Sequence, residues 1–197
     1  MSRLIAFGCS NTYGQGLEDC YVNGSHGDSP SKLSWPFLLG ELLEKEVVNN
    51  GYPSVSNFEI LYRILNFDFQ KNDVVVILWT FYFRDLIFKD AKNYERIGTW
   101  NKSKIFNDWA MTHSNIDLKI RSLFHMNHAE LYLNSLDIKN FSFVIDPELV
   151  QDIPEYLNIK NLKLNVNLIQ VDNALDEYHL GPISHKRYAL SFYKEMQ

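Results

Sequence analysis

The stretch Val74-Val75-Val76-Ile77-Leu78-Trp79 is a continuous apolar run, rich in β-branched residues, that follows the turn-forming pair Asn72-Asp73. A strand that is covered on both faces lacks the alternation of polar and apolar residues found in a half-exposed strand. The run therefore predicts a central strand of a parallel sheet.

Other predicted strands lie before and after this one in the sequence. Four further segments are predicted strands: residues 3–7, 47–49, 141–145 and 165–171. Predicted helices separate the strands; two start at Ser34-Trp35-Pro36 and Ser56-Asn57, and two span residues 117–136 and 186–196. Strands that alternate with helices indicate an α/β protein, here a three-layer α/β/α sandwich around a mainly parallel, five-stranded sheet.

The length and composition fit one domain. The chain has 197 residues, 46% of them hydrophobic and 14% aromatic, which is enough for one substantial core. We expect a single domain over residues 1–197, with a partly helical insertion around residues 90–116.

The charge pattern argues against two classes of partner. The formal net charge is −5, and the basic residues are scattered, so we expect neither a nucleic-acid binder nor a membrane-surface protein.

The first residues lack the apolar core of a signal peptide, which suggests a cytoplasmic or virus-encoded soluble protein. Cys9 and Cys20 are too few for a disulfide framework.

Two distant segments carry groups suited to nucleophilic catalysis. The first is Phe7-Gly8-Cys9-Ser10-Asn11-Thr12-Tyr13-Gly14, at the end of a predicted strand, and the second is Asp176-Glu177-Tyr178-His179, before the last helix. A carboxylate three residues before a histidine can accept a hydrogen bond from Nδ1, which leaves Nε2 free to activate a serine hydroxyl. The alternative is structural: a turn serine, a helix-capping aspartate and a surface histidine.

These two segments resemble the first and last conserved blocks of the SGNH (GDSL-type) hydrolases. Gly8, Ser10, Thr12 and Gly14 match the first block, and Asp176, His179 and Pro182 match the last. The resemblance implies a flavodoxin-like α/β sandwich in which Ser10 is the nucleophile, His179 the base and Asp176 the group that orients it.

The middle blocks of the family are matched less closely. The segment from Asn49 to Asn57 resembles the second block, with Ser54 where the family has a glycine that donates its backbone N–H to the oxyanion. In the third block, Trp79-Thr80 followed by Arg84 replaces the usual asparagine and resembles a divergent, phage-like branch. The resemblance therefore implies an oxyanion hole formed by the N–H groups of Ser10 and Ser54 and by the side chain of Thr80 or Arg84.

The function implied by the resemblance is a serine esterase that removes a small acyl group from a carbohydrate or similar ester. Two alternatives are a catalytically degenerate binding module and an acyltransferase that uses a sugar hydroxyl as acceptor. No cofactor is expected. His125 and His128 invite a metal interpretation, but no cysteine or dense carboxylate cluster accompanies them, so no metal site is predicted.

Overall fold

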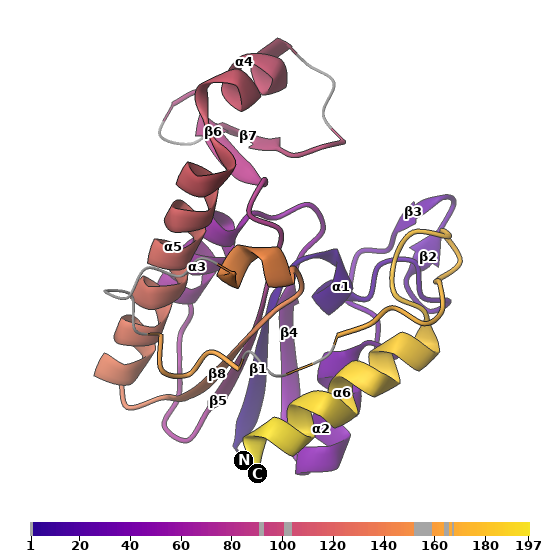
Figure 1. The fold of residues 1–197 in the computed structure, drawn as a ribbon. Coiled ribbons are helices and arrows are strands. Elements are labelled where there is room, and N and C mark those ends of the chain that lie inside the picture. Colours follow the sequence, from indigo (N-terminus) through magenta and orange to yellow (C-terminus); the bar gives the residue numbers. More distant parts are fainter. Residues whose placement is uncertain (1, 91–92, 101–103, 152–158, 164–165, 167) are drawn as a thin grey trace.

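The computed structural model describes residues 2–197 except residues 91–92, 101–103, 152–158, 164–165 and 167. Its centre is a four-stranded sheet in which every pair of neighbouring strands is parallel (Figure 1). The strands, in spatial order, are β4 (Glu46–Gly51), β1 (Arg3–Gly8), β5 (Val74–Trp79) and β8 (Lys139–Val144). The α/β class and the central position of β5 are thus confirmed.

The strand order indicates where a ligand is expected to bind, at the carboxyl ends of the strands. Within the central sheet, β1 comes first in the chain but lies between β4 and β5, the second and third of its strands, as in flavodoxin-like sheets. The strand order therefore reverses between β1 and β5. In such sheets ligands bind beyond the carboxyl ends of the strands, at this point of reversal.

The predicted fifth strand is not found in the part of residues 165–171 that the structure describes, from which residues 165 and 167 are left out. The chain meets β8 earlier, at one isolated parallel bridge between Ser142 and Leu162. Val166 and Leu168 instead pack against the hydrophobic core. Their apolar side chains are explained by this packing, although the described residues of the segment pair with no strand there.

Helices cover both faces of the sheet (Figure 1). They are α2 (Trp35–Leu43), α3 (Asn57–Leu65), α5 (Asn115–Ser135) and α6 (Pro182–Met196). Alternate residues of β1 enter two separate clusters: Ile5 and Phe7 pack with α3 and α5, whereas Leu4 and Ala6 pack with α2 and α6. This division is the three-layer sandwich that the alternation of strands and helices predicts.

A buried hydrogen bond ties α2 to α6. The backbone N–H of Trp35 donates to Nδ1 of His185 over 3.1 Å, and the ring of Trp35 packs on Phe192. Burial lowers the pKa of His185 to about 4, because the charged imidazolium would lose its hydration. This histidine is therefore neutral at pH 7 and serves the packing of the two helices.

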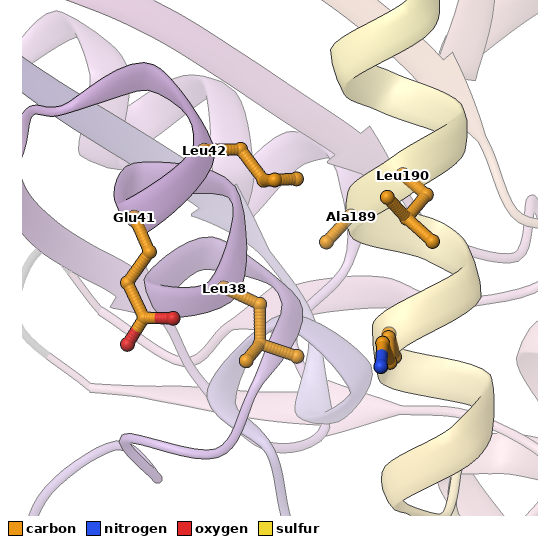
Figure 2. Close-up of a pocket in the computed structure, with 6 residues that line it drawn as sticks. Leu38, Glu41, Leu42, Ala189 and Leu190 are labelled. Atoms are coloured by element: carbon orange, nitrogen blue, oxygen red, sulfur yellow. The ribbon is translucent and has the colours of Figure 1, made fainter.

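The surface over these two helices carries an apolar groove of about 380 Å³. Leu38 and Leu42 of α2 point toward Ala189 and Leu190 of α6 (Figure 2). The groove includes none of the residues predicted to form the catalytic site.

Two small hairpins and a short helix lie outside the sandwich, and the sequence patterns did not predict the hairpins. They are β2 (Tyr21–Val22) with β3 (Ser25–His26), and β6 (Asp85–Phe88) with β7 (Tyr94–Ile97), followed by α4 (Lys104–Thr112). Arg96 on β7 donates twice to the buried carboxylate of Glu59 on α3, at 2.8 Å each, and so anchors the second hairpin to the sandwich.

Candidate active site

Ser10 lies directly beyond the carboxyl end of β1, in the short helix α1 (Ser10–Tyr13). The turn that enters this helix is tight, because a Cβ on Gly8 would lie 2.8 Å from the carbonyl oxygen of Leu78 on β5. Glycine therefore lets the chain turn beside the neighbouring strand. Cys9 is buried and precedes the helix as its N-cap, so its thiol is enclosed in the core.

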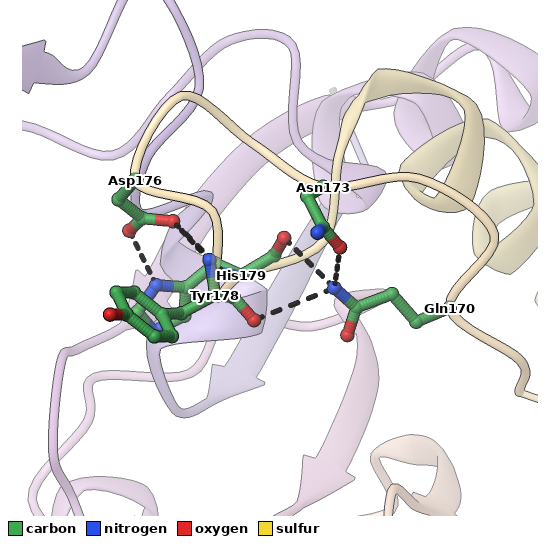
Figure 3. Close-up of polar contacts among 5 residues, drawn as sticks. All are labelled: Gln170, Asn173, Asp176, Tyr178 and His179. Atoms are coloured by element: carbon green, nitrogen blue, oxygen red, sulfur yellow. Dashed lines mark hydrogen bonds and ion pairs between the residues drawn. The ribbon is translucent and has the colours of Figure 1, made fainter.

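The aspartate and histidine of the second segment form the predicted contact. Nδ1 of His179 lies 2.6 Å from Oδ2 of Asp176 (Figure 3). The other oxygen of Asp176 accepts the backbone N–H groups of Tyr178 and His179, at 3.1 and 3.0 Å. The carboxylate therefore fixes both the loop and the ring that the loop carries.

These hydrogen bonds also control the charge of Asp176. Burial alone would raise the pKa of its carboxyl, but the bonds from the N–H and imidazole of His179 and from the N–H of Tyr178 outweigh burial and lower the pKa. Asp176 is consequently ionised at neutral pH, as a partner of an Nδ1–H group must be.

Gln170 braces the same loop from the opposite side (Figure 3). Its Nε2 donates to Oδ1 of Asn173 at 2.7 Å and lies 3.1 Å from the carbonyl oxygen of His179. The backbone of His179 is thus held at its N–H by Asp176 and at its carbonyl by Gln170. No sequence motif pointed to Gln170, because its role depends on a contact between loop segments.

A glycine brings the serine segment and the histidine segment together. Gly16 follows α1 with φ +86°, and a Cβ there would lie 2.7 Å from the carboxyl carbon of Asp176. The carbonyl of Gly16 accepts the N–H of Leu175 at 2.9 Å. Only glycine fits this close approach, which docks the Asp176 loop against the chain that follows Ser10.

Ser10 and His179 line one cavity of about 300 Å³. Asn11 and Arg84 add polar groups to its wall, and the remaining lining residues are Phe81, Ile145, Leu168, Gln170, Tyr178, Leu180 and Tyr188. Among the residues that the structure describes, Ser10 has no side-chain hydrogen bond, so the serine and the imidazole share the cavity without a direct bond. Catalytic hydrogen bonds often tighten only when substrate is bound.

The predicted oxyanion donors occupy different environments. Ser54 has φ +62°, a left-handed backbone conformation that glycine adopts most easily, although it does not line the cavity. Thr80 is fully buried, and the Asn57 side chain binds both its N–H and its carbonyl. Of the two side chains proposed as the third donor, only that of Arg84 reaches the cavity.

Within the described residues, no cluster of three or more histidine, cysteine, aspartate or glutamate side chains is arranged to hold a metal ion. Burial lowers the pKa of His125 to about 4, and its ring packs on Phe58, so this histidine is enclosed among aromatic groups. In the same part of the chain, no helix is both long and apolar enough to cross a bilayer.

Comparison with known proteins finds similar structures but no match by sequence. No family model matches the chain, and no curated protein matches it. A solved carbohydrate esterase, whose active site is described as displaying divergent catalytic and non-catalytic binding functions, superposes with a TM-score of 0.64 at 12% identity, covering 99% of this chain and 64% of that one.

Two further solved structures are similar. A carbohydrate esterase family 2 enzyme with a carbohydrate-binding domain, from Corynascus thermopiles (Myceliophthora fergusii), gives a TM-score of 0.60 at 12% identity, over 99% of this chain and 65% of that one. The aryl esterase of M. smegmatis gives 0.53 at 10% identity, over 100% of this chain and 98% of that one. The chain thus spans about two thirds of the two carbohydrate esterases.

The strand order, the layers and these superpositions agree on one architecture. The chain has the fold of the SGNH (GDSL-type) hydrolases. The phage-like branch suggested by Trp79-Thr80 and Arg84 stays a prediction.

Proposed function

We propose that the protein is a serine ester hydrolase with Ser10 as nucleophile, His179 as general base and Asp176 as its orienting carboxylate. The observation that carries the proposal is the 2.6 Å contact between Nδ1 of His179 and Asp176, in a loop that shares a cavity with Ser10. A hydrogen bond at Nδ1 leaves Nε2 as the proton acceptor.

The reaction has two balanced halves. Oγ of Ser10 attacks the ester carbonyl carbon while Nε2 of His179 takes the hydroxyl proton, and the tetrahedral intermediate then expels the alcohol, which receives that proton. Water attacks the acyl-serine in the same manner, gives its proton to His179, and releases the carboxylic acid as Ser10 regains its hydrogen. Asp176 stays ionised and stabilises the imidazolium in both halves.

The developing oxyanion needs donors that are already in place. We assign this role to the N–H groups of Ser10 and Ser54 and to a side chain, for which Arg84 is better located than Thr80 because Arg84 lines the cavity. Loss of one such donor typically costs about 10²–10³ in kcat. The left-handed backbone of Ser54 supports its use in place of the family's glycine.

The substrate class follows by analogy with the fold and is part of the proposal. Two structural neighbours are carbohydrate esterases, which favours a small acyl group on a carbohydrate or a similar ester. The same acyl-enzyme would support transfer to a sugar hydroxyl in place of water, and an assay with an acetyl donor and a sugar acceptor separates the two outcomes.

The test compares Ser10→Ala with the wild-type protein on 4-nitrophenyl acetate. We expect the variant to lose hydrolysis, because the base then has no nucleophile to activate. Ser25→Ala, at an exposed serine in the hairpin β2–β3 and away from the cavity, is the matched control and should behave as wild type. Equal hydrolysis by Ser10→Ala and wild type would refute the assignment.

A binding module is the second candidate, favoured by one observation: Ser10 has no hydrogen bond to His179, although both line the cavity. Labelling with a fluorophosphonate distinguishes it from an esterase. An activated Ser10 becomes covalently labelled in wild type and not in Ser10→Ala, whereas a pure binding module is labelled in neither.

A further inference from the structure

The cavity that holds Ser10 and His179 contains a cation that has no acidic partner among the described residues. Arg84 lines this cavity, and its Nε and Nη1 are buried with no hydrogen-bond partner in that part of the chain. None of the described lining residues is an aspartate or glutamate, and Asp176 is already bonded to His179. The guanidinium therefore lacks the counter-charge that buried arginines normally have.

Aromatic rings hold this guanidinium in place. Its central carbon lies 4.9 Å from the ring centroid of Phe81 and 5.0 Å from that of Trp100, and Phe81 in turn stacks on Phe83 at 5.1 Å. Contact with a ring face orients the planar group but satisfies none of its N–H donors. The donors of Arg84 are thus positioned by packing and left available to something else.

Two other arginines show how a guanidinium with a structural task is held in this protein. Arg3 binds Asp73 through Nε at 3.0 Å and Nη2 at 2.6 Å, and Arg96 binds Glu59 in the same two-pronged way. Among the described residues, no carboxylate binds the guanidinium of Arg84, although its Nε and Nη1 are buried and unpartnered. An oxyanion forms only after Ser10 has attacked, so it cannot be the partner of this group when substrate first binds; with a carboxylate on Arg84, the oxyanion is left to the N–H groups proposed for it, those of Ser10 and Ser54.

We propose that Arg84 binds a carboxylate carried by the substrate, so that the natural ester bears a second, anionic group within reach of the cavity. This inference rests on the proposed esterase function and specifies its substrate class. A guanidinium matches a carboxylate in two parallel hydrogen bonds, and none of the described lining residues is an aspartate or glutamate that would repel it. A sugar acid with an acyl group, or a half ester of a dicarboxylic acid, has this chemistry.

The experiment measures binding in a protein that cannot turn the ligand over. Monomethyl glutarate, an anionic half ester, and dimethyl glutarate, its neutral match, are titrated by calorimetry into Ser10→Ala and into Ser10→Ala combined with Arg84→Met. We expect the loss of Arg84 to weaken monomethyl glutarate binding by about 10–100-fold, the range for a hydrogen bond to a charged group, and to leave dimethyl glutarate unchanged.

Two further variants keep the result interpretable. Arg84→Lys retains the charge without the fork and should give an intermediate loss, which a misfolded protein would not. Arg121→Met removes an exposed arginine that pairs with Asp117 outside the cavity, and should leave both affinities at the values of the Ser10→Ala protein.

The outcomes separate this inference from the proposed function. Equal monomethyl glutarate affinity with and without Arg84 overturns the carboxylate site, whatever the hydrolysis assay shows. So does an equal loss for both ligands, because that would mean Arg84 shapes the cavity without recognising charge. Charge-selective binding in a protein whose Ser10→Ala variant hydrolyses as fast as wild type would retain the carboxylate site and refute the esterase.

Discussion

Replacing Asp176 by asparagine tests whether this residue sets the proton position on His179. In the structure, one carboxylate oxygen accepts two backbone N–H groups and the other faces Nδ1 at 2.6 Å. An asparagine oxygen can keep the two backbone bonds, but its NH₂ group must then face Nδ1. That arrangement favours the imidazole tautomer with its proton on Nε2, which cannot accept a proton from Ser10.

The expected magnitudes differ sharply between activity and stability. A triad with the wrong tautomer loses about 10⁴ in kcat, equivalent to about 5.4 kcal/mol of transition-state stabilisation. The Asp176→Asn protein loses only one charge-assisted hydrogen bond in a partly exposed site. Its free energy of unfolding should therefore fall by about 1 kcal/mol, which lowers Tm by about 2–4 °C for a chain of this size. Asp176→Ala removes the backbone bonds as well, so its Tm should fall further than that of Asp176→Asn.

The assay follows kcat for 4-nitrophenyl acetate and the rate of fluorophosphonate labelling, with Tm recorded for each variant. Asp176→Asn should lose activity by orders of magnitude at a nearly unchanged Tm. Activity within tenfold of wild type in a folded Asp176→Asn protein would refute the reasoning, because His179 would then keep its working tautomer without a carboxylate.

Three further predictions concern the framework around the site. Glu59→Gln replaces a buried carboxylate that binds the partly exposed Arg96, and should lower the free energy of unfolding by about 1.5–3 kcal/mol in chemical denaturation; a change under about 0.5 kcal/mol would contradict it. Gly16→Ala introduces a Cβ 2.7 Å from the Asp176 carboxyl carbon at φ +86°, so both Tm and esterase activity should fall, and an unchanged Tm would count against this close approach. For His185, the pKa is about 4 in the folded protein and about 6.5 when unfolded. The unfolded chain therefore binds more protons between these values, and stability falls as pH drops from about 6.5 toward 4. His185→Asn should flatten this part of the curve of unfolding free energy against pH, and an equally steep curve would disprove the assignment.

Much of the fold follows from sequence because three strands of the central sheet are largely buried. The apolar runs of β1, β5 and β8 need no tertiary information to be recognised. The hairpin β6–β7 was missed because its strands, including Arg96, mix charged and apolar residues and are fixed by a contact with Glu59 on a distant helix. The predicted fifth strand failed for the opposite reason: Val166 and Leu168 are apolar because they pack, although they form no ladder.

In the candidate site too, some contacts could be predicted from sequence and others could not. The contact between Asp176 and His179 could be predicted, because a separation of three residues in one loop almost determines it. The place of Gln170 could not be predicted, since it joins the cavity wall only through the docking of separate loops. Arg84 was singled out by the resemblance of the third block, but only the structure shows that none of the described residues gives it an acidic partner.

The dependence of the site on two remote segments has a consequence for synthesis. All four strands of the central sheet precede residue 145, and Ser10 belongs to the first βα turn, whereas the proposed base comes only with the loop before α6. On the proposed function, a chain that grows from its amino end carries its nucleophile from the start and gains its base only when nearly all of the chain has been made. The same late segment supplies α6, so a chain interrupted before that loop would lack both the proposed base and one of the two helices, α2 and α6, that cover one face of the sheet.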